Sequence, residues 1–216
     1  MRFDAALFDL DGTLLDTLAD LAAATNAALE RHGFPPHPTA AYRRIVGDGQ
    51  VNQILRALPA SDRDEATVAR VLAAAREEYA RRWADHTRLY GGVAAMLNEL
   101  AARGVRMAVL SNKPHAMTLQ AADRFLAAWP MEVVLGARDG VPLKPDPSAA
   151  LEVAARMGLA PARFLYVGDT NTDMQTARAA GMHAVGALWG FRDEAELRAA
   201  GATELIDRPA RLLDLL

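Results

Sequence analysis

Two aspartates, Asp9 and Asp11, stand two positions apart directly after an apolar run at 5–8. A short apolar run of this kind is typical of a buried strand, and Gly12 allows the chain to turn where that strand ends. Carboxylates so close together repel one another, and a hard cation that prefers oxygen ligands, such as Mg²⁺, relieves the repulsion. These residues therefore predict a carboxylate site at the end of the first strand.

Three further groups of polar residues stand at or near the ends of predicted strands. They are Ser111 and Asn112, Lys144, and Asp169 with Asp173. A parallel α/β sheet gathers the carboxyl ends of its strands at one edge, where ligands bind. One carboxylate can act as a nucleophile toward phosphorus and a second can give or take a proton. Hydroxyl, amide and ammonium groups hold phosphate oxygens, and the remaining carboxylates hold the metal. The set therefore predicts phosphoryl transfer.

The elements that must position these residues alternate between strand and helix from about residue 89 onward. Strands are predicted at 105–110, 131–135, 164–167, 183–188 and 204–206, with helices between them and a loop at 136–147. This alternation predicts an α/β fold built on a doubly wound parallel sheet.

The stretch at 17–86 has a different character, because its apolar residues recur at helical spacing and it contains no strand candidate. We therefore expect an all-helical unit inserted after the first strand. The predicted domains are a core at 1–16 and 87–216 and a helical cap domain at 17–86.

Composition narrows the classes of function. The chain has 216 residues, 51% of them apolar, a formal net charge of -3 and no cysteine, which excludes disulfides and thiolate metal sites. No dense basic run points to nucleic acid, and no apolar run is long enough to span a membrane. The N-terminus leads into the first strand without an apolar leader. We expect a soluble, cytoplasmic monomer or homodimer that binds neither nucleic acid nor membrane.

Four motifs resemble those of the haloacid dehalogenase superfamily, in that family's order and over almost the whole chain. They are DLDGT at 9–13, LSN at 110–112, LKPDP at 143–147 and GDTNTD at 168–173. The resemblance implies a Rossmann-like core. The helical insertion is similar to the cap of the phosphoglycolate phosphatase-like branch.

The resemblance also implies roles for individual residues. Asp9 would be the nucleophile, Asp11 the acid and base, and Lys144 the residue that stabilises the phosphoaspartate. The transferring phosphate would be bound by Ser111, together with Asn112, Gly12 and Thr13. Mg²⁺ would be held by Asp9, by the backbone carbonyl of Asp11, by Asp169, and by Asp173 either directly or through its waters. Apart from the resemblance, the glycine turn of the cap, comprising Gly47, Asp48 and Gly49, is a candidate for substrate contact if it faces the cleft, and otherwise only shapes the loop.

The second aspartate favours a phosphatase over a dehalogenase, because the alcohol that leaves a phosphate ester needs a proton and a halide does not. The implied substrate is a small phosphorylated metabolite, with 2-phosphoglycolate as the first choice. The alternatives are pyrophosphate, a sugar phosphate, or a non-catalytic module that binds a phosphorylated metabolite. Lys113 is expected to lie at the surface or to contact the substrate rather than to take part in catalysis.

Simpler structural explanations also exist for these residues. Asp9 and Asp11 fit a strand-end turn, Ser111 and Asn112 fit a helix cap, and Asp173 fits the acidic first turn of a helix. The occurrence of all four motifs in order favours the catalytic interpretation.

Overall fold

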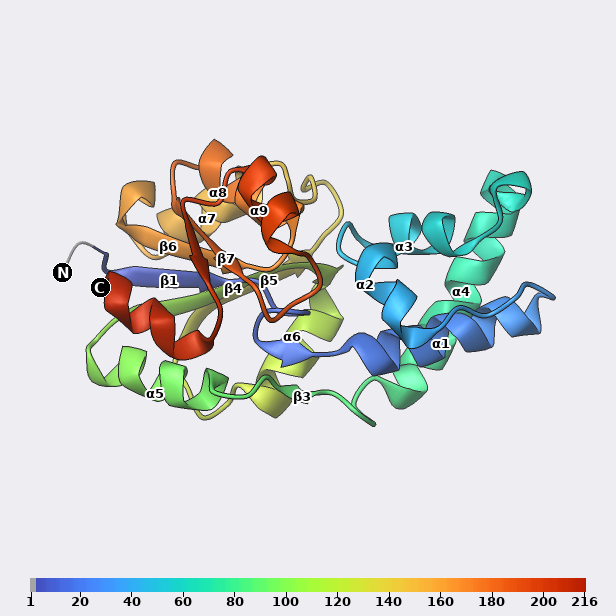
Figure 1. Cartoon of the computed structure of the whole chain (residues 1–216), viewed down its shortest axis with the longest axis horizontal. Coiled ribbons are helices and arrows are strands. Elements are labelled where there is room, and N and C mark those ends of the chain that lie inside the picture. Colours follow the sequence, from blue (N-terminus) through green and yellow to red (C-terminus); the bar gives the residue numbers. More distant parts are fainter. Residues whose placement is uncertain (1–2) are drawn as a thin grey trace. The chain divides into compact units, whose positions relative to one another are not determined.

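The computed structural model describes residues 3–216 and divides into two compact units, shown together in Figure 1. The larger unit comprises the described part of 1–15 together with 89–216, and the smaller one comprises 16–88. The chain passes between them at β2 (Leu15–Asp16) and β3 (Arg88–Leu89), which form a two-stranded sheet. Strands of two residues carry no hydrophobic period, and the sequence did not predict them.

The larger unit is built on a six-stranded parallel sheet with the order β5-β4-β1-β6-β7-β8. The strands are β1 (Ala5–Phe8), β4 (Arg106–Pro114), β5 (Met131–Ala137), β6 (Phe164–Gly168), β7 (His183–Ala187) and β8 (Glu204–Ile206). Every residue of β1 and β6 is buried, as expected for strands covered on both faces. The predicted doubly wound α/β fold is confirmed.

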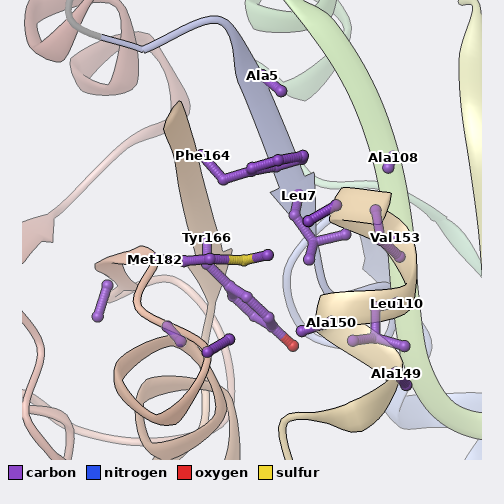
Figure 2. Packing of buried hydrophobic residues seen from close by; sticks show 14 of the residues in the cluster. Ala5, Leu7, Ala108, Leu110, Ala149, Ala150, Val153, Phe164, Tyr166 and Met182 are labelled. Atoms are coloured by element: carbon purple, nitrogen blue, oxygen red, sulfur yellow. The ribbon is translucent and has the colours of Figure 1, made fainter. Parts of the chain in front are cut away.

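Helices cover both faces of this sheet (Figure 1). They are α5 (Val93–Ala102), α6 (His115–Phe125), α7 (Ser148–Arg156), α8 (Asn171–Ala179) and α9 (Glu194–Ala200), with a 3₁₀ helix at Pro209–Leu215. Figure 2 shows one face, where Leu7, Phe164 and Tyr166 pack against Ala150 and Val153 of α7. Alternate residues of a strand share a face, so the other residues of β1 and β6 face the opposite helices.

The strand order identifies β1 as the place where the winding reverses. The chain runs outward from β1 through β4 to β5, returns to the other side of β1 at β6, and runs outward again to β8. In such sheets, ligands bind beyond the carboxyl ends of the strands at the point of reversal. The ends of β1, β4 and β6 therefore carry the candidate site.

The smaller unit is helical between 17 and 86, and it is the candidate for the predicted cap. Its helices are α1 (Leu18–Arg31), α2 (Tyr42–Ile45), α3 (Gln50–Ala57) and α4 (Glu65–Arg82), with 3₁₀ helices at Thr39–Ala41 and Ala60–Asp62. Asp20 of α1 is buried, and its carboxylate accepts hydrogen bonds from the backbone N–H groups of His86 (3.0 Å) and Thr87 (2.8 Å). Helix α1, which follows β2, thus holds the backbone segment that leads into β3.

Two strands are longer than the sequence predicted. Strand β4 continues through Ser111, Asn112 and Lys113 to Pro114, and β5 continues to Ala137 into the expected loop. The pairing register of β4 with β5 shifts between Leu110 and Pro114, which reorients the side chains of the intervening residues. Among residues 3–216, no helix is both long and apolar enough to cross a membrane.

Candidate active site

Residues of all four motifs lie at or near the carboxyl ends of β1, β4 and β6, in the loop that follows β5, and in the first turn of α8. The buried ones include Asp9, Ser111, Lys144, Asp169 and Asp173, each at most 7% exposed. Residues more than a hundred positions apart are thus brought together in one unit, as the strand-end argument predicted. Their assigned roles in catalysis and binding remain predictions.

The turn after β1 requires a glycine at position 12. Gly12 has a φ of 93°, and a Cβ atom on it would lie 2.3 Å from a carboxylate oxygen of Asp169. Its N–H donates to the carbonyl of Leu15 at 2.8 Å, and the N–H of Leu14 donates to the carbonyl of Leu10 at 3.0 Å. The backbone that carries Asp11 is therefore held tightly against the fourth motif.

Three carboxylates crowd together at the centre of the site. Asp9, Asp169 and Asp173 each place one oxygen within 4.8 Å of the others. Burial, followed by the nearby charge of Asp173, raises the pKa of Asp9 to about 7, although the neighbouring Lys144 opposes this shift. Burial and the charges of Asp9 and Asp173 also raise the pKa of Asp169 well above its usual value. Full ionisation of Asp9 and Asp169 is therefore unfavourable without a further cation.

Lys144 is the cation that the chain itself provides to this cluster. Its Nζ donates to Asp173 Oδ1 at 2.7 Å and to the carbonyl of Leu110 at 3.1 Å, and it lies 2.9 Å from Asp9 Oδ1. Burial acts to lower the pKa of Lys144, but the carboxylates of Asp173 and Asp9 raise it well above its usual value. The ammonium is therefore charged at neutral pH and held against the predicted nucleophile.

The two aspartates of the fourth motif are oriented by donors that flank them. Asp169 accepts from Thr13 Oγ1 at 2.7 Å on one oxygen and from the N–H of Phe191 at 2.8 Å on the other. Asp173 Oδ2 accepts from the N–H and the hydroxyl of Thr170, at 3.1 and 2.7 Å. Threonine followed three residues later by an acidic residue is a helix-start signature, and could have identified Thr170. Phe191 acts through its backbone, which no sequence pattern marks.

The polar residues of β4 have separate contacts. Asn112 Nδ2 donates to the carbonyl of Lys144 at 3.0 Å, and Asn112 Oδ1 accepts from the N–H of Lys144 at 2.9 Å. Its amide thus fixes the loop that carries the lysine, a contact that the sequence did not predict. Ser111 is buried, and its hydroxyl accepts from the N–H of Lys113 at 3.2 Å.

Lys113 does not lie at the surface, which was one of the two positions predicted for it. Its side chain is 4% exposed, and its Nζ donates to both carboxylate oxygens of Asp11, at 3.1 and 3.0 Å. Lys113 and Lys144 are the only two lysines among the 216 residues, whereas every other cation of the Lys/Arg type is an arginine. Both lysines contact predicted catalytic aspartates, so the rarity of lysine was a signal for Lys113.

The donor set fits a hard divalent cation. All three clustered residues offer carboxylate oxygens, the ligands that Mg²⁺ prefers. Asp9 Oδ1 is buried, and although the Lys144 ammonium lies 2.9 Å from it, no donor within 3–216 is aligned on it as a hydrogen bond. A cation here would offset the cost of burial and the mutual repulsion that raise the pKa values of Asp9 and Asp169.

The glycine turn at 47–49, which was predicted to contact the substrate, belongs to the smaller unit. Gly47 and Gly49 have φ values of 124° and 86°, and the carboxylate of Asp48 pairs with Arg56. The Asn52 side chain donates to the carbonyl of Asp48 at 3.0 Å. These contacts account for the shape of the turn, and its role in substrate contact stays a prediction.

The buried carboxylates give a testable pH dependence in the metal-free protein. The native pKa of Asp9, about 7, lies above its usual value of 3.8, so the native state binds more protons than the unfolded state between these values. Stability therefore falls as pH rises through this window, by about 1.4 kcal/mol per pH unit for each such group. We expect urea unfolding in EDTA to show decreasing stability from pH 5 to pH 7. Saturating Mg²⁺ should flatten this slope, and an equal slope with and without Mg²⁺ would contradict a cation site at these carboxylates.

Known proteins resemble this chain along most of its length. The sequence model of the family described as haloacid dehalogenase-like hydrolase matches residues 6–187. A phosphoglycolate phosphatase of Pseudomonas putida is 35% identical over 211 residues, covering 96% of this chain and 77% of the relative. An N-acetylmuramic acid 6-phosphate phosphatase of Pseudomonas aeruginosa is 31% identical, covering 100% and 96%. A crystal structure of a protein from Lactobacillus delbrueckii subsp. bulgaricus superposes with a TM-score of 0.94 at 29% identity, covering 100% and 98%.

Proposed function

The chain belongs to the haloacid dehalogenase-like hydrolase family, and from that membership we infer that it is a phosphatase acting through the carboxylate site of its larger unit. We propose that it hydrolyses small phosphate monoesters by way of an aspartyl phosphate on Asp9. The observation that carries this proposal is the contact of a buried lysine, Lys144, with Asp9, the carboxylate that directly follows β1. A second carboxylate, Asp11, follows two residues later.

In the first step, a carboxylate oxygen of Asp9 attacks phosphorus, and the bond between phosphorus and the ester oxygen breaks. Asp11 gives its proton to that oxygen, which leaves as an alcohol. Lys144, which lies 2.9 Å from Asp9 Oδ1, restrains the nucleophile and offsets negative charge that gathers on the transferring group.

In the second step, water attacks phosphorus and the bond between Asp9 and phosphorus breaks. Asp11, now a carboxylate, takes the proton from the attacking water. Inorganic phosphate leaves, and both aspartates return to their starting forms. Ser111, buried at the end of β4, provides a hydroxyl for a phosphate oxygen.

A divalent cation held by Asp9, Asp169 and Asp173 would supply charge neutralisation between the carboxylates and a phosphate dianion. Asp173 Oδ1 accepts a hydrogen bond from Lys144, and Oδ2 accepts from Thr170. This carboxylate therefore also positions the lysine. We propose Mg²⁺ as the cation because all the side chains provide oxygen.

The proposed substrate is 2-phosphoglycolate, supported by the name and identity of the Pseudomonas putida relative. The second candidate is a sugar phosphate, favoured by the relative named for N-acetylmuramic acid 6-phosphate, which aligns with the whole chain. The two differ strongly in size, so one comparison of rates separates them.

The test is a measurement of kcat/KM with Mg²⁺ for 2-phosphoglycolate, N-acetylmuramic acid 6-phosphate, pyrophosphate and p-nitrophenyl phosphate. We expect 2-phosphoglycolate to exceed the other three by at least about tenfold, equivalent to about 1.4 kcal/mol of transition-state binding. A higher value for the sugar phosphate would replace the proposed substrate but retain the reaction. Metal-dependent binding of these compounds without any turnover would instead support a non-catalytic module.

A further inference from the structure

We propose that Lys113 is a positioning residue that directs the carboxyl group of Asp11 for proton transfer. This inference rests on the proposed function, in which Asp11 protonates the leaving oxygen. It starts from an ion pair that none of the assigned roles explains. Lys113 Nζ lies 3.1 Å from Asp11 Oδ1 and 3.0 Å from Oδ2, and the two side chains are only 4% and 17% exposed.

The backbone on the lysine side of the pair is fixed. The carbonyl of Lys113 accepts a hydrogen bond from Thr118 Oγ1 at 3.1 Å, and its N–H donates to Ser111 Oγ at 3.2 Å. A Cβ atom on Gly136 of β5 would lie 2.6 Å from that same carbonyl, so a side chain there would displace it. The register shift of β4 falls at these residues. The site thus includes a local distortion that places the lysine opposite Asp11.

The backbone of the aspartate is fixed as well. Hydrogen bonds from Gly12 to Leu15 and from Leu14 and Leu15 to Leu10 close the turn that carries Asp11, at 2.8 to 3.0 Å. The side-chain torsions of Asp11 are then its remaining freedom. Contact with Lys113 on both oxygens selects one orientation of the carboxylate.

The ammonium group of Lys113 determines which way the O–H of a protonated Asp11 points. Ammonium has three donors and no acceptor, so a protonated Asp11 cannot point its O–H at Lys113. Protonation of one Asp11 oxygen therefore breaks that oxygen's contact with the lysine and turns its O–H outward, while the other oxygen keeps the contact. When Asp11 is a carboxylate, both oxygens contact the ammonium, and one of them accepts from the attacking water through its second lone pair. Lys113 itself neither gives nor takes a proton.

Leaving groups that differ in their need for a proton test this role. The phenolate released from p-nitrophenyl phosphate is stable without protonation, whereas benzyl phosphate releases an alkoxide that needs it. We expect Lys113→Met to lower kcat/KM by about 10²-fold for benzyl phosphate and by less than about fivefold for p-nitrophenyl phosphate. Lys113→Arg, which keeps the charge, should recover part of the difference. Equal losses for both esters, or no loss for either, would overturn the proposal.

The ratio of the two rates is internal to each variant, so it is unaffected by the fraction of protein that folds. In an Asp11→Asn background, Lys113→Met should leave this ratio unchanged, because the proton donor is already absent; a further change would count against the proposal. The inhibition constant of inorganic phosphate should be the same in wild type and Lys113→Met. A weakened constant would assign Lys113 to phosphate binding instead.

The contact itself has a readout that does not depend on turnover. With only two lysines in the chain, ¹⁵N-lysine labelling gives two side-chain ammonium signals. Asp11→Asn should shift the signal that Lys113→Met removes, and no shift would contradict the ion pair. If the wild type hydrolyses neither ester, the proposed phosphatase function fails. If it hydrolyses both and the ratio is insensitive to Lys113, only the role of Lys113 fails.

Discussion

Asp9→Asn is expected to lower phosphatase kcat by at least about 10⁴-fold while raising the stability of the metal-free protein at neutral pH. Activity falls because the amide cannot form the bond to phosphorus. Stability rises because a buried carboxylate loses its charge, which removes both the cost of burying that charge and its repulsion of Asp173, the causes that raise the pKa of Asp9 to about 7. A loss of activity together with a gain of stability distinguishes a catalytic role of Asp9 from a structural one.

The measurements are p-nitrophenyl phosphate turnover with Mg²⁺ and urea unfolding in EDTA at pH 7.5. Asp123→Asn is the matched control, because Asp123 is an exposed residue of α6 and the same change there should leave both quantities near wild type. Full activity in Asp9→Asn would refute the aspartyl-phosphate mechanism. Loss of activity together with loss of stability would show that Asp9 supports the fold.

Lys144→Met is expected to abolish activity as well, but to lower stability by about 3–5 kcal/mol in the metal-free protein. Its ammonium lies 2.7 Å from Asp173 Oδ1 and 2.9 Å from Asp9 Oδ1, and all three groups are buried. Removing one partner of a buried ion pair leaves uncompensated charge, which costs much more than the pair itself contributes. The two substitutions therefore agree in their effect on activity and differ in their effect on stability.

Urea unfolding of Lys144→Met in EDTA, compared with Arg103→Met, measures this cost. Arg103 is an exposed cation 3.7 Å from Glu99, and loss of such a surface pair changes stability by at most about 1 kcal/mol. The combined variant Asp9→Asn/Lys144→Met should be more stable than Lys144→Met alone, because it removes one of the unpaired charges. If Lys144→Met and Asp9→Asn/Lys144→Met were equally stable, the charge of Asp9 would cost nothing without the lysine, contrary to the prediction.

The sequence predicted the sheet and the clustering of its strand ends for a clear physical reason. Strands such as β1 and β6 are buried on both faces, so they read as unbroken apolar runs that end in polar residues. A parallel sheet places those ends at one edge wherever they occur in the chain. Asp9 and Asp169 were therefore placed at one edge without knowledge of their contacts, whereas Lys144 lies in the loop between β5 and α7.

Other features depend on contacts that leave no pattern in the sequence. The Phe191 N–H that orients Asp169 belongs to the backbone, which is the same for every residue type except proline. The Asn112 amide binds the main chain of Lys144, and its partner is set by tertiary packing. The register shift between Leu110 and Pro114 is a property of two paired strands, so neither strand predicts it alone. Lys113, which is buried, lies within that shift.

Within each unit, the segment where the chain leaves is bonded to the segment where the chain returns. In the larger unit, the N–H of Tyr90 donates to the carbonyl of Leu14 at 3.1 Å. In the smaller one, Arg88 pairs with Asp16 at 3.1 Å, and Asp20 holds the backbone of His86 and Thr87. An insertion whose ends are adjacent can be lengthened, shortened or exchanged without stretching its host. The helical segment can thus diversify in evolution, or be replaced by recombination, while the sheet that carries the carboxylates is inherited unchanged.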